Sequence, residues 1–367
     1  MNLYLDSIIF ALQRSGGISV YWSEMLKYIL ASGTAVQMLE HPSALLNIQR
    51  SMLELPTQAI VKDMPIPLGV ARYLPALPSC PNADIFHSSY YRTPRQRGIK
   101  QVVTVYDFTY EFFRSGLRRF VHTRQKQQAI LAAAGIICIS ESTRQDLLRL
   151  YPTISPEKTR VIHLGVSEAF HPNDGTTALT DDLHWLSKTK YVIFIGDRND
   201  YKNFDLAVQS VERVADCHLV IVGGGQLSGT EYELLERCLN NRYRHLQGVS
   251  ESALNILYNY AFCLLYPSRY EGFGLPPLEA MRAGCPVIAV NCSSLPEVCG
   301  KAALLTEKPD VGLFVQQIRA LEQTNLRHEM IARGHEQSRK FRWESTCQKT
   351  MSFYHEIAAG LPPETCI

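Results

Sequence analysis

Short apolar segments rich in β-branched residues alternate with longer amphipathic segments along almost the whole chain. The pattern predicts strands at Leu3–Leu5, Ile85–His87, Gln101–Tyr106, Gly135–Ser140, Tyr191–Gly196, His218–Val222, Ala261–Tyr266, Pro286–Val290 and Ala302–Leu304. It predicts helices at Val20–Leu30, Glu141–Leu150, Phe204–Val214, Thr230–Leu239, Ser252–Tyr260 and Leu278–Ala283. Near-continuous apolar strands that alternate with helices are typical of parallel sheets covered on both faces.

The length and a change in composition predict two α/β domains. A chain of 367 residues exceeds the usual size of one domain. The segment FHPNDGTTALTDD, residues 170–182, is rich in turn formers, and a new strand begins at Tyr191. We therefore predict one doubly wound, Rossmann-like domain over 1–172, a second over 185–345, and a final helix over 346–367.

Composition excludes several classes of protein. A net charge of +2 argues against a nucleic-acid-binding protein, because such domains are strongly basic. No run approaches 18 uninterrupted apolar residues, so we expect no membrane span. The N-terminal MNLYLDSIIFALQRSGG has no basic region before its apolar residues, and we interpret it as a strand and turn, not a signal peptide.

Ten cysteines are scattered along the chain without a CxxC pair. Most of them lie inside apolar runs, so we expect free buried thiols in preference to disulfides or metal ligands. Free thiols are typical of a reducing compartment, which favours the cytoplasm.

Polar or glycine-rich residues follow most of the predicted strands. The segments IFHSSYY, VVTVYDFTYE, IICISEST, VIFIGDRNDYKN, LVIVGGGQ and CLLYPSRYEGFG all show this. Ligands of open α/β sheets bind beyond the carboxyl ends of the strands. We therefore predict a ligand cleft between the two domains.

Two loops offer groups for phosphate binding. In GDRNDYKN, Gly196 ends a strand, and Arg198 and Lys202 follow before a helix. Two cations and helix N-terminal amides can hold a diphosphate, although a solvated surface loop would have the same composition. Gly17 follows the first strand and begins a helix, so its amide can face a phosphate too; no P-loop follows it.

The three glycines of VIVGGGQL, including Gly225, do not form a dinucleotide fingerprint. The GxGxxG spacing is absent, and no acidic residue ends the next strand at the expected distance. We interpret the run as a tight turn at the rim of the cleft and place a dehydrogenase last among the candidate functions.

The segment EGFGLPPLE has two glutamates on either side of a break in regular structure. Glu271 follows a strand, Gly272 and Gly274 expose backbone amides, and Glu279 lies about one turn into the next helix. Carboxylates can accept hydrogen bonds from sugar hydroxyls, and exposed amides can hold an anion. Because the two glutamates lie between a strand and a helix, this spacing predicts a ligand site with carboxylates for sugar hydroxyls and amides for an anion.

At this point the chain resembles a known family. SRYEGFGLPPLEAMRAGCPVIAVNCSSLPEVCGKAALL resembles the signature of retaining GT-B glycosyltransferases of family GT4, a group related to sucrose synthase and mannosyltransferases. GGISVYWSEML, FIGDRNDYKNFDLAVQSV, LVIVGGGQL and GVSESALNILYNYAFCLLYPS follow in the family's order. The resemblance covers nearly the whole chain and is most specific over 191–305. It implies two Rossmann-like domains with a cleft between them, and a C-terminal helix that crosses back to the N-terminal domain.

The resemblance also implies roles for single residues. Glu271 would contact the donor sugar, Glu279 would bind the ribose hydroxyls, and Arg198 and Lys202 would neutralise the leaving diphosphate. The other donor-side positions would be Gly17, Gly196, Gly225, Val249, Leu254, Gly272, Phe273, Gly274 and Leu275.

The chain departs from the family's pattern at two places. Asp197 separates Gly196 from the arginine, so Lys202 is the safer phosphate ligand. Tyr106 stands where many relatives have a histidine, which leaves Asp107 and His87 as candidate catalytic groups of the N-terminal domain.

These parts predict a metal-independent transferase. Arg198, Lys202 and aligned amides can stabilise a departing diphosphate by preorganised charge, and no DxD-type pair ends a strand. Retention of configuration comes from the resemblance alone. We expect no cofactor, and transfer of a hexose from a nucleotide sugar, with a UDP-hexose favoured. The alternatives are a GDP-mannose-dependent mannosyltransferase, a nucleotide-sugar epimerase and a non-catalytic nucleotide-sugar-binding protein.

The acceptor would be a glycan or a lipid-linked oligosaccharide in polysaccharide biosynthesis. The segments YYRTPRQRGIK and FFRSGLRRFVHTRQKQQ combine basic and aromatic residues, which suits an anionic membrane surface. A solvated helix face would have the same pattern. We therefore expect a cytoplasmic protein, with peripheral contact to the inner face of the membrane if the acceptor is lipid-linked.

Overall fold

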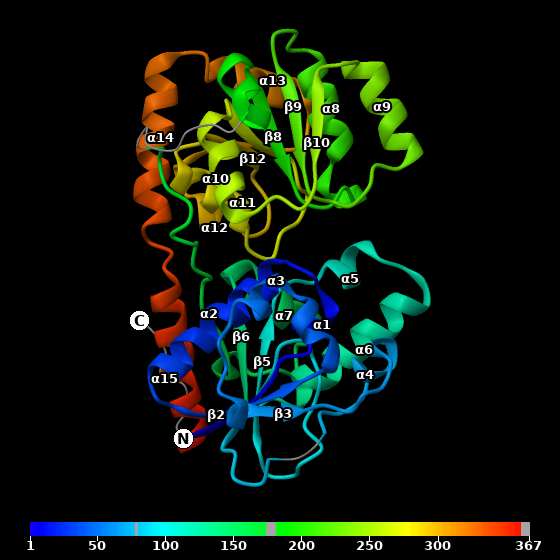
Figure 1. Ribbon diagram of the computed structural model, residues 1–367, viewed down its shortest axis with the longest axis vertical. Helices are drawn as coiled ribbons and strands as arrows, with labels where there is room; N and C mark the ends of the chain where they lie inside the picture. Colours follow the sequence, from blue (N-terminus) through cyan, green and yellow to red (C-terminus); the bar gives the residue numbers. More distant parts are fainter. Residues whose placement is uncertain (78–79, 174–180, 361–367) are drawn as a thin grey trace. The chain divides into compact units, whose positions relative to one another are not determined.

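A computed structural model describes residues 1–77, 80–173 and 181–360 as two compact units (Figure 1). Unit 1 comprises Met1–Gly165 and Trp343–Ile367, and unit 2 comprises Val166–Arg342. Among the described residues, no helix has both the length and the apolar character needed to cross a bilayer.

Unit 1 is built on a seven-stranded sheet in which every strand pair is parallel. The strand order is β3-β2-β1-β4-β5-β6-β7. The strands are β1 (Asn2–Asp6), β2 (Ala35–Glu40), β3 (Ile60–Lys62), β4 (Ile85–Ser88), β5 (Lys100–Val105), β6 (Gly135–Cys138) and β7 (Thr159–Val161). The helices are α1 (Ile9–Leu12), α2 (Gly17–Ala31), α3 (Ile48–Ser51), α4 (Leu68–Ala71), α5 (Thr109–Phe113), α6 (Gly116–Ala132), α7 (Glu141–Leu150) and α15 (Trp343–Ala359).

Unit 2 is built on a six-stranded sheet that is also parallel throughout. The strand order is β10-β9-β8-β11-β12-β13. The strands are β8 (Tyr191–Ile195), β9 (His218–Val222), β10 (Tyr243–Leu246), β11 (Cys263–Tyr266), β12 (Val287–Val290) and β13 (Ala303–Thr306). The helices are α8 (Phe204–Glu212), α9 (Gly229–Leu239), α10 (Glu251–Tyr260), α11 (Leu275–Ala283), α12 (Leu295–Cys299), α13 (Val311–Ala320) and α14 (Thr324–Ser338).

Within the described residues, five 3₁₀ helices lie in the connections. They are η1 (Pro42–Leu46), η2 (Thr57–Ala59), η3 (Pro156–Lys158), η4 (Asp181–Lys188) and η5 (Asp200–Lys202). All described cysteines are free thiols and most are buried, as the sequence predicted for this part of the chain.

The apolar core explains why the strands are so hydrophobic. In unit 2, Val192 and Phe194 of β8 and Ile221 of β9 are buried under α8, which adds Val208. Helices that cover a parallel sheet remove its strands from water on both faces, so these strands have no polar side to alternate with.

Helix α15 returns to unit 1 and covers its sheet. It contacts α2, β4 and β5 (Figure 1). Gly135 of β6 lies under it, where a Cβ atom would be 2.7 Å from Phe353 Cζ and 2.8 Å from Ile357 Cδ1. The glycine therefore lets the helix approach the sheet closely.

The units divide the chain a few residues earlier than the predicted domain limits. Residues 166–173 belong to unit 2 because Phe170 packs on Tyr258 and its carbonyl accepts a hydrogen bond from Arg282 Nε at 3.1 Å. The amide of His171 also donates to Asn255 Oδ1 at 3.0 Å. The centre of the predicted break, 174–180, lies outside the described residues.

The sequence pattern missed β2, β3, β7 and β10. Strands β3, β7 and β10 lie at sheet edges, and β10 (YRHL) has no fully buried residue. Edge strands have one neighbour and keep polar side chains, so their pattern resembles that of a loop.

Candidate active site

The carboxyl ends of the unit 2 strands bring four loops to one edge of the sheet. These loops follow β8, β9, β11 and β12 and consist of residues 196–203, 223–228, 267–274 and 291–294. All four strands are parallel, so their carboxyl ends lie at the same edge. The main elements of the donor site predicted from the sequence are in these loops.

Lys202 and Glu271 form the central pair of this edge. Lys202 Nζ lies 2.6 Å from Glu271 Oε1, and the two side chains are only 13% and 11% exposed. Tyr266, the last residue of β11, places its hydroxyl 3.4 Å from the same Nζ. Burial, and then the charge of Glu271, raise the pKa of Tyr266 well above its usual value, so the phenol stays neutral.

Asn203 holds the two loops of this pair together. It adopts a left-handed backbone conformation (φ +52°) between η5 and α8, which asparagine tolerates better than most residues. Its Nδ2 donates to the carbonyl of Pro267 at 2.7 Å, and the amide of Arg269 donates to the carbonyl of Tyr201 at 2.7 Å. The loops after β8 and β11 are thereby fixed to each other.

The glycine segment between the glutamates leads into α11. Gly274 has a φ of +113°, and a Cβ atom there would lie 3.0 Å from Leu295 Cδ2. Phe273 is buried and α11 begins at Leu275, with Pro276 and Pro277 in its first turn. The N-terminus of a helix carries partial positive charge, so the start of α11 suits an anion.

Glu279 differs chemically from Glu271. It lies one turn into α11 and accepts a hydrogen bond from Tyr258 Oη at 3.1 Å. Burial raises the pKa of Glu279 to about 7, although the tyrosine hydrogen bond opposes this shift. One carboxylate is therefore ion-paired and the other titrates near neutral pH.

The contacts of Arg198 argue against the phosphate-binding role that the sequence predicted. Its Nε donates to Glu231 Oε1 at 2.8 Å. Its Nη1 and Nη2 donate to the carbonyls of Gly223, Gly224, Gly225 and Gln226 at 2.8–3.2 Å. The side chain is 3% exposed. Because its donors serve the glycine turn, we no longer assign Arg198 to the diphosphate.

The glycine run after β9 is the tight turn that the sequence predicted. Gly223, Gly224 and Gly225 all have positive φ angles, between +70° and +84°. A Cβ atom on Gly224 would clash with Arg198 Nη1. The run therefore accommodates an arginine of the same unit.

The remaining predicted donor-side residues lie at the ends of strands and at the starts of helices. Gly196 follows β8 with a φ of +114°. Val249 precedes α10, Leu254 lies in the first turn of α10, and both are half-buried. Gly17 is the first residue of α2 in unit 1. Their contacts with a donor stay predictions.

His87 lies in the core of unit 1, and its burial argues against the catalytic role that the sequence predicted. It is fully buried, Nδ1 is hydrogen-bonded to Tyr354 Oη of α15, and Nε2 lies 3.0 Å from Thr104 Oγ1. Burial lowers the pKa of His87 to about 3, so the ring is neutral. Both ring nitrogens of His87 are hydrogen-bonded inside unit 1, so neither is available to an acceptor sugar.

Asp107 lies in the loop after β5 and stays a candidate. It is half-buried, and its Oδ1 accepts a hydrogen bond from the amide of Thr109 at 2.8 Å. The sequence did not reveal a neighbouring cluster, in which His122 stacks on Tyr110 at 3.8 Å and lies 3.0 Å from Tyr90 Oη. A histidine in the middle of a long polar helix carries no motif that would have identified it.

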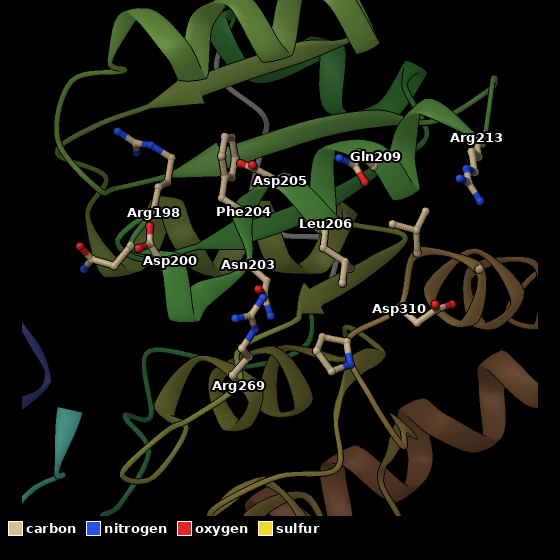
Figure 2. Close-up of a pocket in the computed structure, with 14 residues that line it drawn as sticks. Arg198, Asp200, Asn203, Phe204, Asp205, Leu206, Gln209, Arg213, Arg269 and Asp310 are labelled. Atoms are coloured by element: carbon tan, nitrogen blue, oxygen red, sulfur yellow. The ribbon is translucent and has the colours of Figure 1, made fainter. Parts of the chain in front are cut away.

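A pocket of about 710 Å³ lies beside the loop after β8 (Figure 2). Residues from α8 and from the start of α13 line it, and Arg269 points toward Asn203 in the close-up. Lys202 and Glu271 are not among its lining residues. In the described part of the chain, no group of three or more His, Cys, Asp and Glu residues could hold a metal ion. Metal independence stays a prediction.

Comparisons with known proteins assign the chain to a family. The model described as Glycosyl transferases group 1 matches residues 177–337, and the model described as Glycosyltransferase Family 4 matches residues 15–170. The chain belongs to the group 1 glycosyltransferases. The first of these matches contains Lys202, Glu271 and Glu279.

Two curated relatives of this chain are named as mannosyltransferases. The chain is 30% identical over 236 residues to O-antigen chain mannosyltransferase B of Escherichia coli, covering 62% of this chain and 62% of that protein. It is 24% identical over 249 residues to O-antigen chain mannosyltransferase RfbU of Salmonella typhimurium, covering 66% of each. The matches thus span about two thirds or less of these relatives.

Solved structures confirm the fold. Sucrose-phosphate synthase from Thermosynechococcus elongatus matches with a TM-score of 0.77 at 18% identity, covering 98% of this chain and 100% of that one. WaaG, a glycosyltransferase involved in lipopolysaccharide biosynthesis, matches with a TM-score of 0.68 at 14% identity, covering 96% and 99%. The prediction of two doubly wound GT-B domains is therefore confirmed.

Proposed function

We propose that this protein transfers a hexose from a nucleotide sugar to a glycan or lipid-linked glycan, with retention and without a metal ion. The observation that carries the proposal is the pairing of Lys202 with Glu271 beside the start of α11. It places a cation, a carboxylate and a helix N-terminus at one edge of a parallel sheet. These are the groups that a sugar diphosphate requires.

Lys202 would stabilise the departing diphosphate. An ammonium group has three N–H donors, and one of them serves Glu271 at 2.6 Å. A preorganised cation in a half-buried site stabilises developing negative charge more strongly than it would in water. The start of α11 would add its partial positive charge on the same anion.

The two glutamates would bind different parts of the donor. Glu271, paired with Lys202, would accept hydrogen bonds from the sugar hydroxyls. Glu279 would accept hydrogen bonds from the ribose hydroxyls in its ionised form. In unit 1, Asp107 is the group that we propose near the acceptor.

The relatives change which donor we would test first. Both relatives named above are mannosyltransferases, which favours mannose as the sugar and GDP-mannose as the donor. The UDP-hexose favoured by the sequence is the alternative. Their names also refer to O-antigen chains, so we propose polysaccharide biosynthesis as the process.

A lipid-linked acceptor would require contact with a membrane surface. The α5–α6 surface, defined here as residues 112–120, exposes Leu117 (76%) and Phe120 (67%). Arg114, Arg118 and Arg119 are exposed in the same segment. We propose that this surface contacts anionic lipid headgroups, with aromatic and leucine side chains at the boundary of the acyl chains.

The test is a transfer assay with purified protein, four donors and a panel of acceptors. The donors are GDP-mannose, UDP-glucose, UDP-galactose and UDP-N-acetylglucosamine, each with and without EDTA. We expect one donor to give an EDTA-resistant, α-linked product. A new sugar nucleotide formed without acceptor would identify an epimerase. Donor binding without any transfer across the panel would identify a binding protein.

A further inference from the structure

The loop after β12 holds the Glu271 segment in place through side chains of two serines. Ser293 Oγ accepts a hydrogen bond from the amide of Glu271 at 2.9 Å. Ser294 Oγ lies 3.0 Å from the carbonyl of Glu271 and 2.7 Å from that of Phe273. Both backbone groups of Glu271 are therefore held by consecutive residues of one neighbouring loop.

The same loop contacts the segment on either side of Glu271. Upstream, Cys292 Sγ lies 3.2 Å from the carbonyl of Ser268. Downstream, Leu295 approaches Gly274 so closely that a Cβ atom there would be 3.0 Å from Leu295 Cδ2. Four consecutive residues, 292–295, thus follow the course of residues 268–274. These contacts fix the backbone conformation of the segment that carries Glu271.

Ser293 makes its contact from an unfavourable backbone conformation. Its φ is +47°, in the left-handed region that favours glycine and asparagine. A glycine at this position would relieve the backbone, but it would leave the amide of Glu271 without this acceptor. Strained residues that persist in a folded protein often cluster at functional sites.

We propose that Ser293 is a positioning residue that sets the Glu271 carboxylate against Lys202 and the donor sugar. This inference rests on the proposed function of Glu271. The serine hydroxyl fixes the amide of Glu271, the amide fixes the direction of its side chain, and the ion pair at 2.6 Å depends on that direction. Ser294, which is fully buried, holds the carbonyl side of the same residue.

The experiment separates positioning from stability by replacing Ser293 with glycine. Ser293→Gly removes the strain together with the hydroxyl, so we expect a Tm at or above that of the wild type. We expect kcat to fall about tenfold, because small misplacements of catalytic groups cost large rate factors. The KM for the donor should change less than kcat. A kcat within twofold of the wild type would overturn the proposal.

Asn240→Gly is the matched control. Like Ser293, Asn240 has a positive φ (+52°). It follows the last residue of α9, and its amide donates hydrogen bonds to carbonyls of that helix. This variant should keep the wild-type kcat. Ser293→Asn tolerates the left-handed conformation and offers a carbonyl oxygen, so it should recover part of the lost kcat. No recovery together with a low Tm would mean that position 293 is only structural.

A binding measurement distinguishes a failure of this inference from a failure of the proposed function. By calorimetry, the wild type should bind the nucleotide sugar more tightly than the nucleoside diphosphate, because Glu271 contacts the sugar. Ser293→Gly should lose this difference while retaining its affinity for the diphosphate. An unchanged difference would overturn the role of Ser293 alone. A wild type that binds no nucleotide sugar would overturn both proposals.

Discussion

Two cations of a single loop illustrate how residue chemistry decides function. The guanidinium of Arg198 presents a planar set of donors, and four consecutive carbonyls and Glu231 take them up. The ammonium of Lys202 is a compact charge with rotatable donors, and it lies at the sheet edge next to Glu271. The rigid planar guanidinium of arginine suits fixed multidentate contacts, whereas the ammonium of lysine is a point charge on a flexible stem.

Lys202→Ala should lower kcat by roughly 10²–10³-fold, because it removes preorganised charge from the leaving diphosphate. Lys190→Ala removes a lysine of the same unit that pairs with Asp216 and Glu322, and it should leave kcat unchanged. Steady-state kinetics with the preferred donor is the measurement. Transfer by Lys202→Ala at the wild-type rate would exclude the phosphate assignment.

The pKa of Glu279, raised to about 7 by burial, predicts a pH-dependent donor affinity. The ionised form accepts more hydrogen bonds from the ribose, so the donor KM should fall as the pH rises from 6 to 8, by up to about tenfold. Glu279→Gln should have a flat profile over this range. Equal pH profiles of the two proteins would contradict the prediction.

The same group links pH to stability. The folded pKa of Glu279 lies above its ordinary value of 4.5, so the folded protein retains a proton that the unfolded chain has released. The contribution of Glu279 to the free energy of unfolding therefore decreases as the pH rises from 4.5 to 7, and it is constant above pH 7. Thermal unfolding should show Glu279→Gln gaining stability over the wild type at pH 8 relative to pH 5.

At the scale of elements, helix α15 determines what a sheet residue can do. It covers β4 and β5, and its Tyr354 engages the ring of His87. His87, near the end of its strand, is therefore a buried hydrogen-bonding group. The helix also requires Gly135 beneath it, because both Phe353 and Ile357 occupy the space of a Cβ atom.

Gly135→Ala should destabilise the protein by about 1–3 kcal/mol, since an added methyl group overpacks the contact with α15. Gly69→Ala is a suitable control, because a Cβ atom there meets nothing within 4 Å. Urea unfolding measures both. Combining Gly135→Ala with Ile357→Ala should cost less than the sum of the single changes, because the clash is relieved.

At the scale of the whole molecule, exposed apolar and basic side chains occur together in the α5–α6 surface. Arg114, Arg118 and Arg119 of this surface are exposed. The acidic residue that precedes them, Glu111, is buried and paired with Lys126 at 3.2 Å. Helices α5 and α6 can be followed in teal beside α4 in Figure 1.

The protein should float with vesicles that contain phosphatidylglycerol at low salt and remain behind with neutral vesicles. Leu117→Asp combined with Phe120→Asp should abolish flotation without lowering Tm, because both side chains are exposed. Tyr232→Asp, at an exposed aromatic residue of unit 2 (54%), is the control and should float normally. No flotation of the wild type on anionic vesicles would exclude this contact.

Much of the architecture could be predicted from the chain because it depends on neighbouring residues. Alternating apolar strands and helices predict parallel sheets, and all predicted strands of both units are present with small shifts at their ends. The glycines after β9 require positive φ angles, so their turn was visible as well. The strand, glycine break and helix around Glu271 and Glu279 are likewise local features.

The surroundings of the predicted site residues depend on contacts between residues far apart in the sequence. Arg198 is occupied by Glu231, and His87 by Tyr354, at separations of 33 and 267 residues. The hydrogen bond from the amide of Glu271 to Ser293 Oγ joins the loops after β11 and β12, which are neighbours only because their strands are paired in the sheet. The amino-acid sequence by itself determined which elements form and which chemical groups they carry. Only the tertiary structure decided which of those groups are occupied by partners, because hydrogen bonding and burial depend on neighbours in space.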